Sequence, residues 1–262
     1  MFSFFKNRRR QQLLSVAPSD GFLKCIHQNV AVYPLLSSTE QQRLLDITKI
    51  ISAERRFYGV GDLQITDEVI ATISAQAALL VLHADGYYFD RVGAILVHGK
   101  GPRVRMVHPL GGAELVEEGV PISGQHLEQG EVRLAWEHVL AGGRDPRDGF
   151  NVVLHEFAHH LDWLDGEHDG VPPLANPDDR SHWLDVLDDV CGQIRGDLRA
   201  GYENLLPDHA SDSSVELFAY ATEAFFELPH ELCEDHPELF DCLLSFYITD
   251  PRMWFTEPEN QR

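Results

Sequence analysis

Apolar residues recur at helical spacing through the N-terminal third of the chain. Ser37 and Glu40 form a capping box, in which the side chains of the first and fourth residues satisfy free backbone amides where a helix begins. A helix is therefore predicted from Ser37 to about Arg56. A second helix is predicted to begin at Thr66, whose hydroxyl can cap it, and to end near Gly86.

The pattern changes after residue 87, where short runs of β-branched and apolar residues alternate with turn signals. Apolar residues at every second position are typical of a strand with one buried face. The predicted strands are Val92–His98, Val104–His108 and Glu131–Val139. The last of these comes shortly before the most distinctive helix of the chain.

Helical spacing returns near residue 151 and continues into the C-terminal region. The predicted helices are Asn151–Asp162, His182–Arg199, Val215–Glu227 and Pro237–Ile248. Asp145 or Asp148 is expected to cap the first of them, and Ser213 or Ser214 the third. Helices, then strands, then more helices predict an α+β fold, with a small mixed sheet packed against the first of these helices and the others.

The helix Asn151–Asp162 contains His155-Glu156-Phe157-Ala158-His159, the pattern H-E-x-x-H. Residues four apart lie on one face of a helix, so both imidazoles can bind the same zinc ion. Glu156 lies about 100° further round, where it can act as general base on an activated water without being a ligand. Two solvent-facing histidines are the simpler alternative. The apolar far side of the helix, with Leu154 and Phe157, favours a buried metal site instead.

A catalytic zinc site needs a third protein ligand and one open position. Asp165 has the spacing at which a third ligand follows in the H-E-x-x-H-x-x-G-x-x-H class, but Asp162 replaces the glycine that turns that chain back. His160 should point away from the metal, either exposed or supporting a ligand. His168 and His182 have no fixed spacing to the motif.

Stronger candidates lie on the predicted helix Val215–Glu227, which is almost wholly apolar yet carries Glu216 and Glu223 on one face. Burying a carboxylate costs several kcal/mol unless a cation or hydrogen bonds compensate it. The alternative is that both glutamates lie at a solvent edge. The two are roughly 10 Å apart along the axis, so only one of them can bind the metal.

Composition narrows the possible partners and compartment. The 262 residues are 44% hydrophobic and 24% charged, which is ordinary for a globular protein. The net charge of −21 argues against nucleic acid or an anionic membrane as partner and suits a basic protein. The cysteines are scattered, which predicts reduced thiols and a cytoplasmic protein: Cys25, Cys191, Cys233 and Cys242. No stretch approaches the roughly 20 apolar residues of a membrane span.

Basic residues concentrate at the N-terminus, where apolar residues precede Arg8-Arg9-Arg10. A secretory signal has the reverse order and a longer apolar core. Residues 1–20 are expected to form a flexible basic arm that contributes little to the fold. Residues 21–262 are expected to form a single zinc metallopeptidase domain.

Three segments together resemble one known family: Gly149–Asp162, Val171-Pro172 and Glu216–Phe226. They are similar to the Mlc titration factor A family of zinc metallopeptidases of the bacterial cytoplasm, whose catalytic core is similar to that of anthrax lethal factor. The likeness covers about residues 30–250. It implies a zincin-like fold of the gluzincin type, with one Zn²⁺ per chain bound by His155, His159 and Glu216. Glu223 would then support the site.

The resemblance also implies hydrolysis of peptide bonds, with an aminopeptidase-like preference, and binding of a transcriptional repressor of sugar uptake. Glu156 would be the general base. Related enzymes often carry a tyrosine seven residues before the ligand glutamate, where it stabilises the tetrahedral intermediate. This chain has His209 at that position, and a histidine can donate the same hydrogen bond. His209 is therefore a candidate catalytic residue.

Two further expectations separate an enzyme from its alternative, a non-catalytic zinc-containing protein that sequesters a regulator. A structural zinc site would fill the fourth position with a protein ligand, for which Glu117 and His126 in the upstream loop are candidates. An enzyme of this kind would align an extended peptide along a sheet edge. The predicted strand Glu131–Val139 is the natural edge, provided that it has a partner on one side alone.

Overall fold

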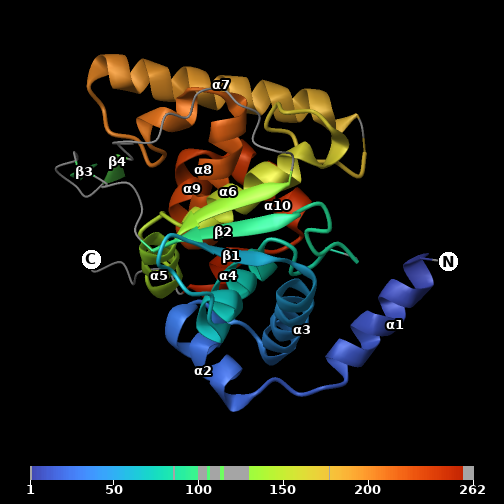
Figure 1. The fold of residues 1–262 in the computed structure, drawn as a ribbon. Coiled ribbons are helices and arrows are strands. Elements are labelled where there is room, and N and C mark those ends of the chain that lie inside the picture. Colours follow the sequence, from blue (N-terminus) through green and yellow to red (C-terminus); the bar gives the residue numbers. More distant parts are fainter. Residues whose placement is uncertain are drawn as a thin grey trace.

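The computed structural model describes residues 2–84, 86–99, 105–106, 113–114, 130–176 and 178–255. A three-stranded sheet lies at its centre, in the order β1-β2-β5 (Figure 1). Its strands are β1 (Phe57–Val60), β2 (Ala94–His98) and β5 (Glu131–Ala135). A separate antiparallel pair consists of β3 (Arg105–Met106) and β4 (Ala113–Glu114).

The α+β prediction is confirmed, but the central sheet is parallel in both of its strand pairs and not mixed. Parallel neighbours need a crossover connection, and helix α4 (Asp67–Leu79) supplies one between β1 and β2. Strand β1 was not predicted, because it is four residues long and three of them are exposed. The predicted strand Glu131–Val139 ends early, and helix α5 (Trp136–Arg144) begins where it stops.

One face of the sheet carries the apolar residues that pack on the helices. Ile95 lies opposite Val132, and Val97 opposite Leu134, in the parallel register of β2 and β5. All four side chains are fully buried, whereas Arg133, between the two on β5, is exposed. This alternation is the one that the sequence pattern predicts for a half-buried strand.

The N-terminal helices are α1 (Phe2–Leu14), α2 (Asp20–Asn29), α3 (Ser38–Glu54) and α4. Both predicted caps are confirmed. Ser37 and Glu40 form the capping box of α3, and the hydroxyl of Thr66 accepts a hydrogen bond from the backbone N–H of Val69 at the start of α4. Helix α4 ends at Leu79, several residues before the predicted stop.

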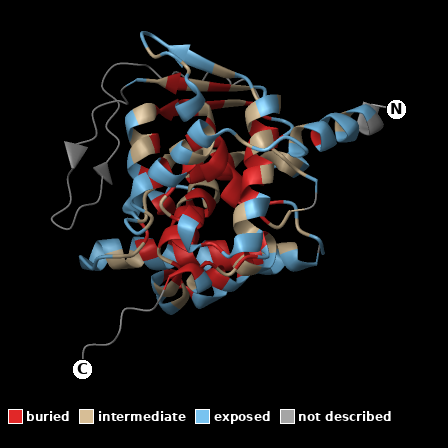
Figure 2. Ribbon diagram, turned by 90° about the horizontal axis from the view of Figure 1, so that it is seen from below, coloured by how far each residue is buried: buried red, intermediate tan, exposed pale blue. Residues whose placement is uncertain are grey.

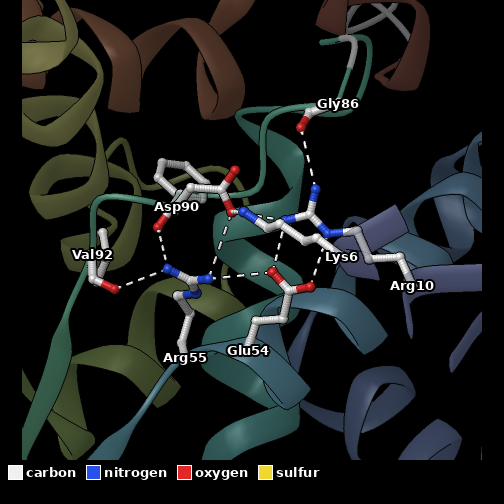
Figure 3. Close-up of polar contacts among 8 residues, drawn as sticks. Lys6, Arg10, Glu54, Arg55, Gly86, Asp90 and Val92 are labelled. Atoms are coloured by element: carbon white, nitrogen blue, oxygen red, sulfur yellow. Dashed lines mark hydrogen bonds and ion pairs between the residues drawn. The ribbon is translucent and has the colours of Figure 1, made fainter. Parts of the chain in front are cut away.

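The segment expected to be a flexible arm forms helix α1 instead. Arg10 anchors it to the body of the protein: it is only 8% exposed and pairs with Glu54 on α3 and with Asp90 in the loop before β2 (Figure 3). The prediction failed because the segment lacks an apolar stripe. A buried ion pair holds it, and hydrophobic spacing does not reveal such pairs.

The C-terminal helices are α6 (Val152–Asp162), α7 (Asp179–Ala200), α8 (Ser214–Glu227), α9 (Pro229–Asp235) and α10 (Pro237–Tyr247). Ser213 caps α8, as predicted. The cap of α6 is Asn151, and the expectation of Asp145 or Asp148 was wrong. The side-chain oxygen of Asn151 accepts the backbone N–H groups of Val153 and Leu154.

Helix α6 lies in the interior, in contact with β5, α4 and α8. Leu154 and Phe157 on the apolar side of α6, and Phe218 and Phe225 of α8, all belong to one continuous buried core. Buried residues concentrate in the interior of the molecule (Figure 2). Each fully buried phenylalanine contributes about 1.5–3 kcal/mol, so the two helices are held firmly against each other.

Two composition-based expectations can be compared with the structure. The four cysteines are free, as predicted. Among the helices of the described residues, none combines the length and the apolar character that crossing a membrane requires.

Candidate metal centre

Helices α6 and α8 bring three polar side chains to one point. His155 and His159 lie one turn apart on α6, and their Nε2 atoms are 3.2 Å from each other. Glu216, in the first turn of α8, places one carboxylate oxygen 3.4 Å from Nε2 of His155 and the other 3.6 Å from Nε2 of His159. Ser213 fixes the start of that turn, because its hydroxyl accepts the N–H of Glu216.

These separations fit a tetrahedral metal ion. Two ligands with bonds of about 2.0–2.1 Å at a tetrahedral angle lie about 3.3 Å apart. The three observed distances lie within a few tenths of an ångström of that value. Two imidazoles and one carboxylate are also a donor set that zinc accepts in catalytic sites. The three side chains are therefore arranged as a metal-binding group.

Glu223, two turns further along α8, contacts the opposite nitrogen of His155. It is 1% exposed, and one of its oxygens lies 2.8 Å from Nδ1 of His155. Its other oxygen accepts the backbone N–H of Asn151, the cap of α6. A carboxylate at Nδ1 keeps the proton on that nitrogen and leaves Nε2 free to bind a metal. Glu223 thus orients His155 and ties the start of α6 to α8.

The two histidines have opposite pKa shifts. Burial lowers the pKa of His155, but its hydrogen bonds to Glu216 and Glu223 outweigh that effect and raise the pKa to about 10. Burial lowers the pKa of His159 to about 4, and the positive charge of His155 adds to the shift. In the metal-free protein, the carboxylates of Glu216 and Glu223 thus favour a proton on His155 over one on His159.

Glu156 lies beside this group. Burial raises its pKa to about 7; the charge of His155 opposes that shift, while the carboxylates of Glu216 and Glu223 add to it. A carboxyl group with a pKa near the working pH can both accept and return a proton. A raised pKa of this kind supports a role for Glu156 as general base.

The other candidate ligands of the sequence lie elsewhere. Asp165, in the short helix η2 (Trp163–Asp165), is paired with Arg180. His160 points its Nε2 at the backbone oxygen of Glu131 on β5, 3.4 Å away. His168 packs against Trp163, with its ring centroid 6.2 Å from that of the tryptophan.

Three other residues were predicted as candidate ligands: His182, Glu117 and His126. His182 is exposed on α7. Glu117 and His126, considered as ligands for the fourth position, lie outside the described residues.

His209 lies on the short helix η3 (Asp208–Ser211), just before α8. Its side chain is 57% exposed, and Nδ1 is 3.3 Å from a carboxylate oxygen of Asp212. Its charge helps to lower the pKa of Glu216, although the hydrogen bond from His155 is the main cause. His209 is thus close enough to affect the metal-binding group electrostatically while its ring faces solvent.

Sequence reasoning missed two side chains around this group. Tyr220 lies one turn after Glu216, and its ring centroid is 4.7 Å from that of His155. Glu227 accepts a hydrogen bond from the side-chain amide of Asn151 at 3.1 Å. Tyr220 is four residues after Glu216, and Glu227 is four residues after Glu223, so helical spacing places each beside a candidate glutamate of α8. This spacing could have identified both residues from the sequence.

Strand β5 lies at the edge of the sheet. It pairs with β2 on one side, and no second strand partner lies among the described residues. Within the described part of the chain, β5 therefore has the edge position that peptide docking along this strand requires. The loop after α6 also passes very close to α8: Gly170 has φ +80°, and a Cβ atom there would collide with the backbone oxygen of Ser214. Only glycine accommodates both the positive φ and the close approach of the α8 backbone.

Residues 4–248 match the family model of the glucose-regulated metallo-peptidases M90. The chain belongs to this family. It is 31% identical over 244 residues to an uncharacterized protein of Synechocystis sp., a match that covers 93% of this chain and 89% of that protein. It is 30% identical over 234 residues to Mlc titration factor A of Yersinia pestis and of Yersinia pseudotuberculosis. Each of these matches covers 85% of this chain and 83% of the relative.

The family resemblance inferred from the sequence is therefore confirmed. An M90 metallo-peptidase requires a metal ion, and the group formed by His155, His159 and Glu216 fits one. The family match and the geometry of α6 and α8 thus point independently to the same chemistry.

Proposed function

We propose that this M90 metallo-peptidase is a zinc enzyme of the gluzincin type that hydrolyses peptide bonds in the cytoplasm. The observation that carries the proposal is the meeting of His155, His159 and Glu216 at tetrahedral spacing, with Glu156 beside them. Zinc bound by these three side chains would supply a Lewis acid. Glu156 takes a proton from the attacking water and returns it to the leaving amine.

His209 is proposed to donate a hydrogen bond to the oxyanion that forms during attack. Its support is its place beside α8 and its electrostatic effect on Glu216. Its exposed ring leaves it free to turn toward a bound substrate. Tyr220 is a second possible donor, because its ring packs on His155. Comparing substitutions at the two positions assigns the role.

Substrate is proposed to lie along the edge of β5 that has no strand partner among the described residues. An extended peptide there would form main-chain hydrogen bonds with the strand, which runs alongside the metal-bearing helix. An aminopeptidase-like preference follows from the family resemblance, and the net charge of −21 suits a positively charged substrate N-terminus. Peptides with free and with acetylated N-termini distinguish this preference from internal cleavage.

The central experiment compares wild type with Glu156→Gln on a peptide library, with zinc content measured for both. Glutamine keeps the shape of the side chain but cannot accept a proton, so we expect retained zinc and nearly abolished turnover. Glu203→Gln, at an exposed position on the loop after α7, is the matched control. Equal turnover in wild type and Glu156→Gln would mean that the hydrolysis does not come from this site.

A regulatory role is proposed beside catalysis. The support is the name of the Yersinia relatives, Mlc titration factor A, and the strongly negative charge, which favours binding to a basic DNA-binding repressor. The affinity of purified protein for the Mlc repressor should fall as salt is raised. If Glu156→Gln binds the repressor and relieves repression as well as wild type does, sequestration without catalysis is sufficient. No binding at low salt would remove the regulatory proposal.

A further inference from the structure

The loop before β2 reaches the middle of the metal-bearing helix. Phe89, in that loop, is fully buried, and its ring meets the ring of Phe157 edge-on with centroids 4.7 Å apart. Phe157 lies directly after Glu156 on α6. A second contact follows at the end of the helix, where the guanidinium of Arg91 lies 5.9 Å from the ring centroid of Trp163. The loop thus supports α6 from the side opposite its ligands.

Phe89 is held in an unfavourable backbone conformation. Its φ is +54°, in the left-handed region that bulky residues rarely adopt. Arg55, at the end of α3, keeps the loop in this shape: its Nη1 donates to the backbone oxygens of Phe89 at 2.9 Å and of Val92 at 3.0 Å. Such a conformation persists only where its surroundings enforce it.

Arg10 of α1 completes this enforcement (Figure 3). Its guanidinium donates two hydrogen bonds to Glu54, at 2.9 and 2.7 Å, and a third of 2.7 Å to Asp90, the residue after Phe89. It also lies over the ring of Tyr88, 4.3 Å from the centroid. Arg10 therefore contacts the residues on both sides of Phe89.

The attachment of α1 depends strongly on this residue. A groove of about 540 Å³ lies between α1 and the helices beneath it, lined by Leu13, Val16 and Phe22 among others. Lys49 holds the far end of α1 through the backbone oxygens of Leu14 and Val16. The Arg10–Glu54 pair is nearly buried, so it is weakly screened and geometrically demanding, whereas Asp90 is partly exposed.

We propose that Arg10 is a positioning residue for the metal site: it fixes the loop so that Phe89 presses on Phe157 and holds α6 in register with α8. The inference rests on the proposed metal site. The three ligand atoms come from two helices, and a shift of α6 by a fraction of an ångström would spoil their spacing. The N-terminal helix would then act on the site without touching it.

The test compares Arg10→Met with Arg8→Met, an exposed arginine on the same helix. Zinc affinity is measured by competition with a chelator, and kcat and KM on a peptide substrate, at a temperature where all variants are fully folded. We expect Arg10→Met to weaken zinc binding about tenfold and to lower kcat with little change in KM, the lower end of the effect of removing a supporting group at a metal site. Arg8→Met should match wild type.

Phe89→Leu tests the route. It should weaken zinc binding to a similar degree, and the double variant with Arg10→Met should be no worse than Phe89→Leu alone, because both act through the same contact. Independent, multiplying effects would overturn the route through Phe89. If Arg10→Met does not fold, Asp90→Asn removes the Arg10–Asp90 ion pair, together with the pairs of Asp90 with Lys6 and Arg55, and leaves the Arg10–Glu54 pair in place; it should also weaken zinc binding.

Unchanged zinc affinity and kcat in Arg10→Met, with lower unfolding stability alone, would show that Arg10 is merely structural and overturn the proposal. Zinc affinity is measured independently of peptidase activity. The positioning role of Arg10 and the proposed peptidase function can therefore be refuted separately. Wild type without peptidase activity, but with zinc binding weakened in Arg10→Met, would contradict the proposed function and retain the positioning role.

Discussion

The substitution Glu223→Gln tests whether the orientation of His155 matters for metal binding, because it leaves all three proposed ligands in place. Glu223 is 1% exposed and uses both oxygens, one toward Nδ1 of His155 at 2.8 Å and one toward the backbone N–H of Asn151. Glutamine has nearly the same volume, so packing is preserved. Its amide has one acceptor oxygen and a donor NH₂ group, so one of the two N–H groups must lose its acceptor.

The expected loss of zinc affinity follows from the contact with His155 that the variant weakens. Removing a group that supports a metal-binding histidine typically weakens metal binding about 10–100-fold, or roughly 1.4–2.7 kcal/mol. A buried donor without a partner costs about 1–3 kcal/mol, so the metal-free protein should also be destabilised. The pKa of His155, raised to about 10 by its bonds to Glu216 and Glu223, should fall in the variant.

Chelator competition gives the zinc dissociation constant, and NMR titration of the imidazoles in metal-free protein gives the pKa of His155. Glu203→Gln makes the same chemical change at an exposed position and should alter neither. A zinc dissociation constant equal to that of wild type would refute the idea that Glu223 orients the ligand. A lower unfolding stability on its own would reduce its role to holding α6 against α8.

Further predictions concern pH, catalysis and the metal. Burial raises the pKa of Glu227 well above its usual value, so the folded state keeps a proton that the unfolded state releases, and stability should fall as pH rises from about 4.3 through the folded pKa. Glu227→Gln should therefore be more stable than wild type in denaturant unfolding at pH 8, with the gain vanishing in acid; a constant difference at all pH values would contradict this. His209→Ala should lower kcat about a hundredfold with little effect on KM, and His209→Tyr should retain activity; wild-type turnover in the alanine variant would exclude His209 from catalysis. Removing the metal with a chelator should lower the melting temperature, with recovery on adding zinc, and His155→Ala or Glu216→Ala should abolish both responses.

Much of the site could be predicted because it depends on local geometry. Helical spacing places His155 and His159 on one face whatever surrounds them, and Ser213 caps α8 with its own side-chain hydroxyl, three residues before Glu216. The role of Glu223 could not be predicted from the residues alone, because it depends on how α6 packs on α8. Spacing shows that a carboxylate lies on the helix, but it does not show which nitrogen the carboxylate meets.

The errors have a common physical cause. Asp145 and Asp148 are suitable caps by residue type, yet the chain turns so that Asn151 occupies the capping position and Asp148 contacts Glu227. Helix α1 is held in place by the hydrogen bonds between Arg10 and Glu54, which are 44 residues apart in the chain. In each instance long-range packing selects among locally acceptable alternatives, and a single sequence pattern does not contain that information.

The parallel sheet constrains when the metal site can form during folding. Phe57 pairs with Ile95 and Ala94 with Glu131, so each strand pair must close a long stretch of chain before it gains any contact. Glu216 joins the histidines only when α8 has docked on α6, a contact between segments that are likewise far apart in the chain. We therefore expect that zinc does not nucleate this fold. We expect added zinc to slow unfolding far more than it speeds refolding, since its ligands are assembled only near the native state.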